Sequence, residues 1–213
     1  MKISLNPKIK NKFVYYLYYG MRVLVALAIV AFAINGDWVS VVNASLILGL
    51  MLLPRLVKMQ YKIYIPLGLE VAIVGFIFLS LFLGSLRNYY ERFPLWDGVL
   101  HFQSGILLGV VGFVVVYLLN ATKTSKFRMS PGFVSFFAVC FSMALSVVWE
   151  VYEYAVDSWF GYTMQESGLP DTMGDLIVNC SGAIIVGLLS YFWMKKTENL
   201  PFAPEKFNNY TIN

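Results

Sequence analysis

The chain has 213 residues, of which 59% are hydrophobic, 17% aromatic and only 13% charged. Soluble domains carry roughly 25% charged residues, so this composition, with a mean hydropathy of +0.68, excludes a soluble globular protein and indicates an integral membrane protein. The net charge of +4 does not indicate a nucleic-acid partner, because the Lys and Arg residues flank apolar segments instead of forming a stripe with interleaved aromatics.

Six apolar segments are long enough to cross a lipid bilayer, which takes about 20 residues. They are Tyr16–Ile34, Trp38–Leu53, Tyr64–Gly84, Pro94–Leu119, Pro131–Trp159 and Thr172–Met194. Helix breakers such as Pro54 and Gly161 stand at the edges of these segments. We therefore expect an all-α, polytopic membrane protein: a six-transmembrane-helix bundle that forms a single domain over residues 1–213, with a polar tail at about 195–213.

The charges predict how the chain is oriented. All of the 16 Lys and Arg residues except Arg87 and Arg92 lie at one end of the array of segments or just inside it. By the positive-inside rule both termini are cytoplasmic, in the cytoplasmic (inner) membrane of a bacterium. Two isolated charges, Arg22 in the first segment and Glu70 in the third, lie at comparable depth and are expected to pair.

The outer end is acidic. Nine of the 12 acidic residues and the only histidine fall there. In the fourth segment Asp97 and His101 are four residues apart and so share one helical face. Gly105 and Gly109 follow on that face and let a neighbouring helix approach closely, which predicts that His101 is buried.

The fifth segment carries Glu150, Glu153 and Asp157 on one face. Like charges at this spacing repel one another, so they need a cation, protons or strong hydrogen-bond donors between them. A solvated helix end explains Asp157 more readily than Glu150, which follows an uninterrupted apolar run.

The sixth segment begins with a second set of polar residues. Asp171 is expected to cap the helix, a structural role. Asp175 and Asn179 lie one and two turns deeper on the same face, with Gly182 near it for close packing. Capping does not explain these two residues.

Motifs between residues 90 and 190 resemble the YjdF family of predicted bacterial inner-membrane proteins. They are Asp97-x-x-x-His101-Phe102, Trp149-Glu150-x-Tyr152-Glu153-Tyr154 and Asp171-Thr172-Met173-x-Asp175-x-x-x-Asn179-x-x-Gly182-Ala183. The same histidine, glutamate and Asp-x-x-x-Asn-x-x-Gly pattern is distantly similar to the VanZ-like family, whose founding member is linked to glycopeptide resistance; Gln165 would match a glutamine of that family. The resemblance implies a bacterial membrane location and the importance of these positions, but no reaction.

Three functions stay open. In the first, His101 and the carboxylates bind a divalent metal, zinc, manganese or iron, for chemistry on a lipid-linked or envelope substrate. In the second, the acids form a protonatable site in a small transporter or lipid-handling protein, although the chain shows no repeat or paired broken helices. In the third, they join helices in a noncatalytic membrane subunit. Gly174-Asp175 is also similar to a short motif of intramembrane aspartyl proteases, with Asp157 as the partner.

We expect one outward-facing acidic pocket between the fourth, fifth and sixth segments. Its expected catalytic residues are Asp97, His101, Glu150, Glu153 and Asp175, and the metal ligands among them are His101, Glu150, Glu153 and Asp175. Asn179 is expected to orient the substrate or a carboxylate, and Asp157 and Gln165 to contact the substrate at the mouth. The connection Ser158–Pro170 is expected to act as a lid. The predicted partners are the bilayer and a lipid-linked substrate, and the oligomeric state stays open.

Overall fold

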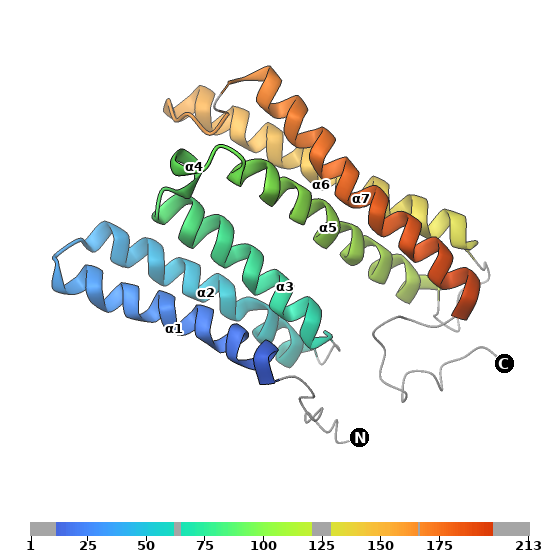
Figure 1. Ribbon diagram of the computed structural model, residues 1–213, viewed down its shortest axis with the longest axis horizontal. Helices are drawn as coiled ribbons and strands as arrows, with labels where there is room; N and C mark the ends of the chain where they lie inside the picture. Colours follow the sequence, from blue (N-terminus) through green and yellow to red (C-terminus); the bar gives the residue numbers. More distant parts are fainter. Residues whose placement is uncertain (1–11, 62–64, 121–128, 166, 198–213) are drawn as a thin grey trace. The chain divides into compact units, whose positions relative to one another are not determined.

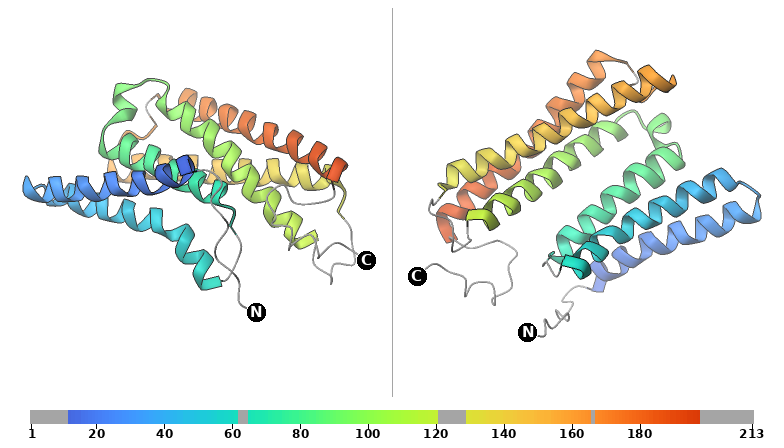
Figure 2. Two further views of the ribbon diagram at one scale, coloured as in Figure 1. Left: turned by 60° about the horizontal axis from the view of Figure 1, so that its bottom comes forward. Right: turned by 180° about the vertical axis from the view of Figure 1, so that it is seen from behind.

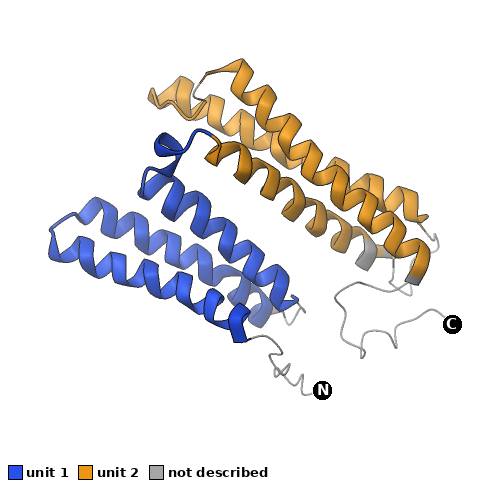
Figure 3. Ribbon diagram, in the orientation of Figure 1, with its two compact units in different colours: residues 1–94 blue, residues 95–213 orange. Residues whose placement is uncertain are grey.

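The computed structural model describes residues 12–61, 65–120, 129–165 and 167–197, and the regular structure in these ranges is entirely helical (Figure 1). Six of its helices are long and apolar enough to cross a membrane, which confirms the predicted fold class. The chain forms two compact units, Met1–Pro94 and Leu95–Asn213, each with three of these helices (Figure 3). The two units are described separately below.

Unit 1 begins with a hairpin of long helices. Its elements are α1 (Lys12–Ile34), α2 (Trp38–Tyr61), α3 (Leu67–Ile77), the π-helix η1 (Phe78–Leu86), which continues α3, and the single turn α4 (Tyr89–Arg92). Its core is formed by apolar side chains from α1, α2, α3 and η1, among them Val25, Met51 and Val74. The expected start of the third segment at Tyr64 lies outside the described residues.

A tight turn joins α1 to α2. Gly36 adopts a left-handed backbone conformation there, with φ of 73°, which glycine reaches without steric cost. The carboxylate of Asp37 accepts a hydrogen bond of 3.1 Å from the backbone N–H of Ser40, in the first turn of α2. Hydrogen bonds from Ser40 lower the pKa of Asp37 below its usual value of 3.8. The turn therefore falls between the predicted segments Tyr16–Ile34 and Trp38–Leu53, as expected.

The prediction that Pro54 ends the second segment is wrong, because α2 continues through this proline to Tyr61. Proline removes a backbone donor and weakens the hydrogen bonding of the preceding turn, but membrane helices tolerate it where another group satisfies the freed carbonyls. In the turn before Pro54 the Arg22 guanidinium donates a hydrogen bond to the carbonyl oxygen of Met51, next to Leu50, whose carbonyl loses its helical donor at Pro54.

The predicted pairing of Arg22 with Glu70 is also wrong. The Glu70 carboxylate forms an ion pair of 3.2 Å with Lys58 and accepts a hydrogen bond of 3.0 Å from the Tyr18 hydroxyl. Arg22 stacks over the Tyr18 ring, with its guanidinium carbon 3.8 Å from the ring centroid. Tyr18 thus contacts both Arg22 and Glu70. Lys58 of α2, and not Arg22, is the cation that pairs with Glu70.

Unit 2 consists of α5 (Trp96–Asn120), α6 (Pro131–Phe160) and α7 (Leu169–Thr197), and each helix packs against the other two (Figure 2). The start and end of α6 follow from its sequence. The Ser130 hydroxyl caps the N-terminus by accepting a hydrogen bond from Phe133 N–H, and Pro131 occupies the first turn. Gly161 ends the helix with φ of 69°. Residues 198–213, most of the predicted tail, lie outside the described part of the chain.

Glycines let α5 and α7 touch backbone to backbone. A Cβ atom on Gly105 would clash with the carbonyl oxygen of Asn179, and one on Gly182 would clash with the carbonyl oxygen of Phe102. A Cβ on Gly109 would lie 3.2 Å from the Val186 side chain. These contacts agree with the close approach expected from the glycine spacing.

Candidate functional site

The expected catalytic residues come together inside unit 2. We call them the acid–histidine cluster: Asp97 and His101 of α5, Glu150 and Glu153 of α6, and Asp175 of α7. His101 is only 6% exposed and is therefore directed into the helix bundle, as the glycine pattern predicts. Helical spacing places Asp97 one turn before His101, and the close packing of α5 on α7 brings Asp175 to the same imidazole.

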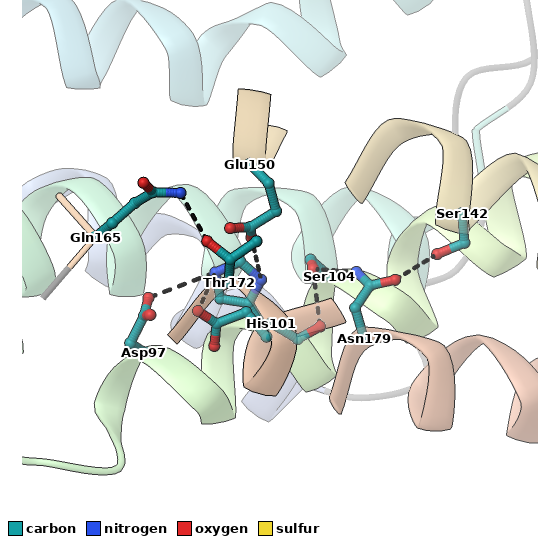
Figure 4. A network of polar contacts seen from close by, with 9 residues as sticks. Asp97, His101, Ser104, Ser142, Glu150, Gln165, Thr172 and Asn179 are labelled. Carbon is teal, nitrogen blue, oxygen red and sulfur yellow. Dashed lines mark hydrogen bonds and ion pairs between the residues drawn. The ribbon is translucent and has the colours of Figure 1, made fainter. Parts of the chain in front are cut away.

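Carboxylates face both nitrogens of the His101 ring (Figure 4). Nε2 lies 3.6 Å from Asp97 Oδ1 and 4.0 Å from Asp175 Oδ2. Nδ1 lies 3.8 Å from Glu150 Oε1. Each separation exceeds the 2.7–3.2 Å of an ordinary N–H···O hydrogen bond and is close to the separation of about 3.4 Å between two ligand atoms that share one tetrahedral ion.

Two overlapping sets of three residues have the spacing of metal ligands. Asp97, His101 and Asp175 form one set, and His101, Glu150 and Glu153 form the other. In each set one ligand atom per residue lies within 4.8 Å of the others. Imidazole nitrogen with carboxylate oxygens is a donor set that suits zinc, manganese or iron.

Glu150 is a buried carboxylate near the polar side chains of Thr172 and Gln165. It is 4% exposed, and neither of its carboxylate oxygens has a hydrogen-bond partner among the described residues. Glu153, one turn further along α6, is 7% exposed. A buried carboxylate without donors is strongly destabilised unless a cation or a proton accompanies it.

Unit 2 offers the cluster no basic side chain among its described residues. The Lys and Arg residues in this part of the unit are Lys195 and Lys196, in the last turn of α7. Asp175 lies near the start of the same helix, about 30 Å away at 1.5 Å per residue. Four acids therefore surround one imidazole, and no Lys or Arg side chain among the described residues of unit 2 lies near them.

A polar layer lies one turn below the cluster and joins all three helices. Asn179 donates to the Ser104 hydroxyl at 2.8 Å and accepts from the Ser142 hydroxyl at 3.3 Å. The Ser104 hydroxyl in turn donates to the backbone carbonyl of His101 at 2.8 Å. Asn179 is fully buried, and both ends of its carboxamide are bound to protein. Its role in orienting a substrate stays a prediction, since its contacts in the structure are with these serines.

Asp157 lies in the last turn of α6, and Gln165 lies in the connection from α6 to α7. The Asp157 carboxylate accepts hydrogen bonds from the backbone N–H groups of Met164, at 2.7 Å, and Gln165, at 2.8 Å. The Gln165 carboxamide donates to the Thr172 hydroxyl at 2.7 Å, beside Glu150 and His101 (Figure 4). The described part of the expected lid is thus fastened to both helices. Contact of these two residues with a substrate stays a prediction.

The structure also bears on two predictions about acidic residues, the capping role of Asp171 and the pairing of Asp157 with Asp175. Because α7 begins at Leu169, Asp171 lies inside the first turn and not at the capping position, where its charge still favours the helix dipole. The pairing of Asp157 with Asp175 as in an aspartyl protease has no support from the contacts, since both Asp157 oxygens bind backbone N–H groups.

The sequence interpretation missed the supporting hydroxyl groups. Ser142 and Ser146 lie eight and four residues before Glu150, on the same buried face of α6, and Ser104 lies three residues after His101. Their helical spacing could have shown from the sequence alone that these serines lie on the same helix faces as Glu150 and His101. Ser146 Oγ is buried without a hydrogen-bond partner among the described residues.

Comparison with known proteins gives a family but no activity. A curated protein of Thermotoga maritima, described as "Uncharacterized protein", is 29% identical over 143 residues, which cover 66% of this chain and 69% of that protein. No solved structure matches the chain significantly. The family model described as "Predicted membrane protein (DUF2238)" matches residues 17–196, which include the whole acid–histidine cluster. The chain therefore belongs to the DUF2238 family of multi-pass membrane proteins.

Proposed function

We propose that unit 2 is a divalent-metal site that performs hydrolytic chemistry on a lipid-linked phosphate or another envelope substrate at the extracytoplasmic side of a bacterial inner membrane. The observation that carries this proposal is the Glu150 carboxylate, buried and without a hydrogen-bond donor beside the His101 imidazole. A divalent cation would satisfy both of its oxygens and offset the neighbouring carboxylates.

The donor types and their spacing support a transition-metal ion. Its candidate ligands are His101, Glu150, Glu153 and Asp175, and Asp97 adds a further negative charge beside them. A bound divalent ion would supply Lewis-acid polarisation of a phosphate oxygen or a water molecule of lowered pKa. The protein side chains would fix the geometry of this site on three rigid helices and exclude bulk water from it.

The position of the cluster supports a substrate at the membrane surface. Asp97 and Asp175 lie in the first turns of α5 and α7, while Glu150 and Glu153 lie in the last turns of α6. All four acids are therefore at the same end of their helices, the end that the Lys and Arg distribution assigns to the outside. A lipid-linked substrate can keep its chain in the bilayer while its polar head reaches this end of unit 2.

Elemental analysis of protein purified without a polyhistidine tag tests the proposal. We expect about one equivalent of zinc, manganese or iron per chain, and at least a 100-fold loss of metal affinity in Glu150→Gln and in His101→Ala. Glu70→Gln is a matched control, because Glu70 is also a buried membrane glutamate, 4% exposed, but lies in unit 1. Its metal content should equal that of the unaltered protein.

Activity is tested by incubating the metal-loaded protein with an undecaprenyl-type lipid phosphate in vesicles and measuring phosphate release. Release that Glu150→Gln abolishes and Glu70→Gln preserves is expected. A folded, metal-free protein that carries out proton-coupled uptake in vesicles would overturn the proposal in favour of a transporter. Unaltered growth and envelope lipids in cells that carry alanine at each cluster position would overturn it in favour of a structural role.

A further inference from the structure

The acid–histidine cluster has two chemically different sides, which meet at the His101 ring. Nδ1 faces Glu150 of α6, which forms a set of possible ligands with His101 and Glu153, and Nε2 faces two aspartates, one on α5 and one on α7. A neutral imidazole has one lone pair and one N–H, so its two nitrogens cannot serve the same purpose. If one nitrogen binds a cation through its lone pair, the other nitrogen carries the N–H.

Burial distinguishes the two sides. His101, Glu150 and Glu153 are all buried, whereas the set on the other side contains Asp97, whose side chain is 31% exposed. Solvent can stabilise the charge of Asp97, but the Glu150 carboxylate is buried and receives no hydrogen bond from the described residues. The need for a cation is therefore greater on the Nδ1 side.

A divalent ion on the Nδ1 side also satisfies charge balance. Glu150 and Glu153 together carry two negative charges if both are ionised, and one divalent ion bound between them and the neutral imidazole leaves a neutral buried group. On the other side a neutral imidazole can give Asp97 and Asp175 one N–H. Metal-bound histidines almost always donate their second ring N–H to a carboxylate, a carbonyl or water.

We infer that the ion of the proposed metal site binds His101 through Nδ1, together with Glu150 and Glu153, while Asp97 and Asp175 are positioning residues, which lie 3.6 and 4.0 Å from Nε2 and would accept its hydrogen once the ion is bound. This inference rests on the proposed function and assigns a different role to each half of the cluster. The two aspartates act through His101: they fix its tautomer and ring orientation and raise its basicity as a ligand. Three protein ligands leave an open coordination position for water or a phosphate oxygen.

The single histidine of the chain makes a direct test possible. Protein labelled with ¹⁵N-histidine contains one labelled imidazole, provided that the purification tag has no histidine. After loading with ¹¹³Cd²⁺, we expect one-bond cadmium–nitrogen coupling at Nδ1 and a proton-bearing Nε2 in long-range ¹H–¹⁵N spectra. Coupling at Nε2 would overturn the assignment but leave the metal site itself intact.

Amide variants test the two roles separately, with Cd²⁺ and Zn²⁺ as the probes. Glu150→Gln and Glu153→Gln each remove a ligand and should abolish stoichiometric binding. Asp97→Asn and Asp175→Asn should bind about 10- to 100-fold more weakly, as is typical of partners that orient a ligand, and should still show coupling at Nδ1. The altered tautomer balance of His101 in these aspartate variants is a signature that general destabilisation would not produce.

The failures of the two proposals are distinguishable. Metal that is lost in the aspartate variants but retained in both glutamate variants would overturn the inference and support binding on the other side. Unaltered, folded protein that takes up no Cd²⁺ or Zn²⁺ would overturn the proposed function and the inference with it. Folding of every variant is checked by its melting temperature in detergent, with Glu70→Gln as the control outside the cluster.

Discussion

Asn179 of α7 donates a hydrogen bond of 2.8 Å to Ser104 of α5, one turn from His101, and so links the two helices that carry the histidine and Asp175. The other end of the same carboxamide accepts from Ser142 of α6. One fully buried side chain thus connects the three helices of unit 2 directly below the acid–histidine cluster. The spacing of the cluster depends on this connection.

Replacing Asn179 by alanine should destabilise unit 2. The change removes two interhelical hydrogen bonds and leaves the Ser104 and Ser142 hydroxyls with fewer partners, so we expect a loss of about 1–2 kcal/mol. Thermal unfolding in detergent would show it as a lower melting temperature. Ser181→Ala is the control, since that exposed hydroxyl bonds only within its own helix, to Ile177; an equal loss in both variants would contradict this role of Asn179.

Replacing Gly182 by alanine should force α5 and α7 apart. The added methyl group would meet the Phe102 carbonyl oxygen, a backbone atom that cannot move aside alone, and overpacking of this kind costs about 1–3 kcal/mol. Gly174→Ala on the same helix has no atom within 4 Å of the new methyl and should be neutral or slightly stabilising. Equilibrium unfolding of both variants in bicelles provides the comparison, and similar stabilities would refute the close contact.

In unit 1, Tyr18→Phe should weaken the polar group around Glu70. The Tyr18 hydroxyl donates to Glu70 at 3.0 Å, and its loss leaves Lys58 as the remaining partner of that carboxylate among the described residues. We expect a decrease in stability of about 0.5–1.5 kcal/mol, measured by unfolding in detergent. Metal content should not change, because the cluster belongs to unit 2; a coupled loss of metal would contradict this independence.

Asp157→Asn should loosen the connection that follows α6. The carboxylate accepts two backbone N–H groups on its two oxygens, whereas an amide presents an NH₂ group to one of them. Hydrogen exchange at Met164 and Gln165 should become faster, which mass spectrometry of the corresponding peptides would detect. Gln165→Ala, which keeps both backbone donors, should change this exchange less than Asp157→Asn does.

Acidification should release the turn between α1 and α2. The hydrogen bonds from Ser40 lower the pKa of Asp37 below 3.8, so the ionised carboxylate stabilises the folded turn at higher pH. This stabilisation is present above about pH 3.8 and is lost as the pH falls through the lowered value. The protection factor of the Ser40 amide, which is its intrinsic exchange rate divided by the observed rate, should therefore fall as the pH drops through the lowered pKa of Asp37. In Asp37→Asn this protection factor should show no such pH-dependent step.

Much of the fold could be predicted because the sequence features that determine it are local. Apolar length gives the six spanning helices, and Gly36 and Pro131 mark the turns between them. Pro54 misled the prediction, because a proline inside an apolar membrane helix does not have to end it, and the packing that lets α2 continue to Tyr61 is not encoded locally. The single-domain organisation and the cytoplasmic location of the termini stay predictions.

The residues of the cluster could be predicted, but their partners could not. The spacing of Asp97, His101, Glu150 and Asp175 places each on a definite helical face, and burial of charged groups in a membrane favours their meeting. Which oxygen faces which ring nitrogen depends on the rotation and depth of three helices, which the sequence does not encode locally. For the same reason Glu70 was assigned to Arg22 and not to Lys58.

The glycine contacts also set a lower limit on the size of the cluster. At Gly105 and Gly182 main-chain atoms of α5 and α7 already touch, so the turns that carry His101 and Asp175 cannot move closer together. A site on loops can contract around what it binds, but these two helices cannot close any further. The separation of the His101 imidazole from Asp175 therefore has a minimum that does not depend on the ion bound on the Nδ1 side.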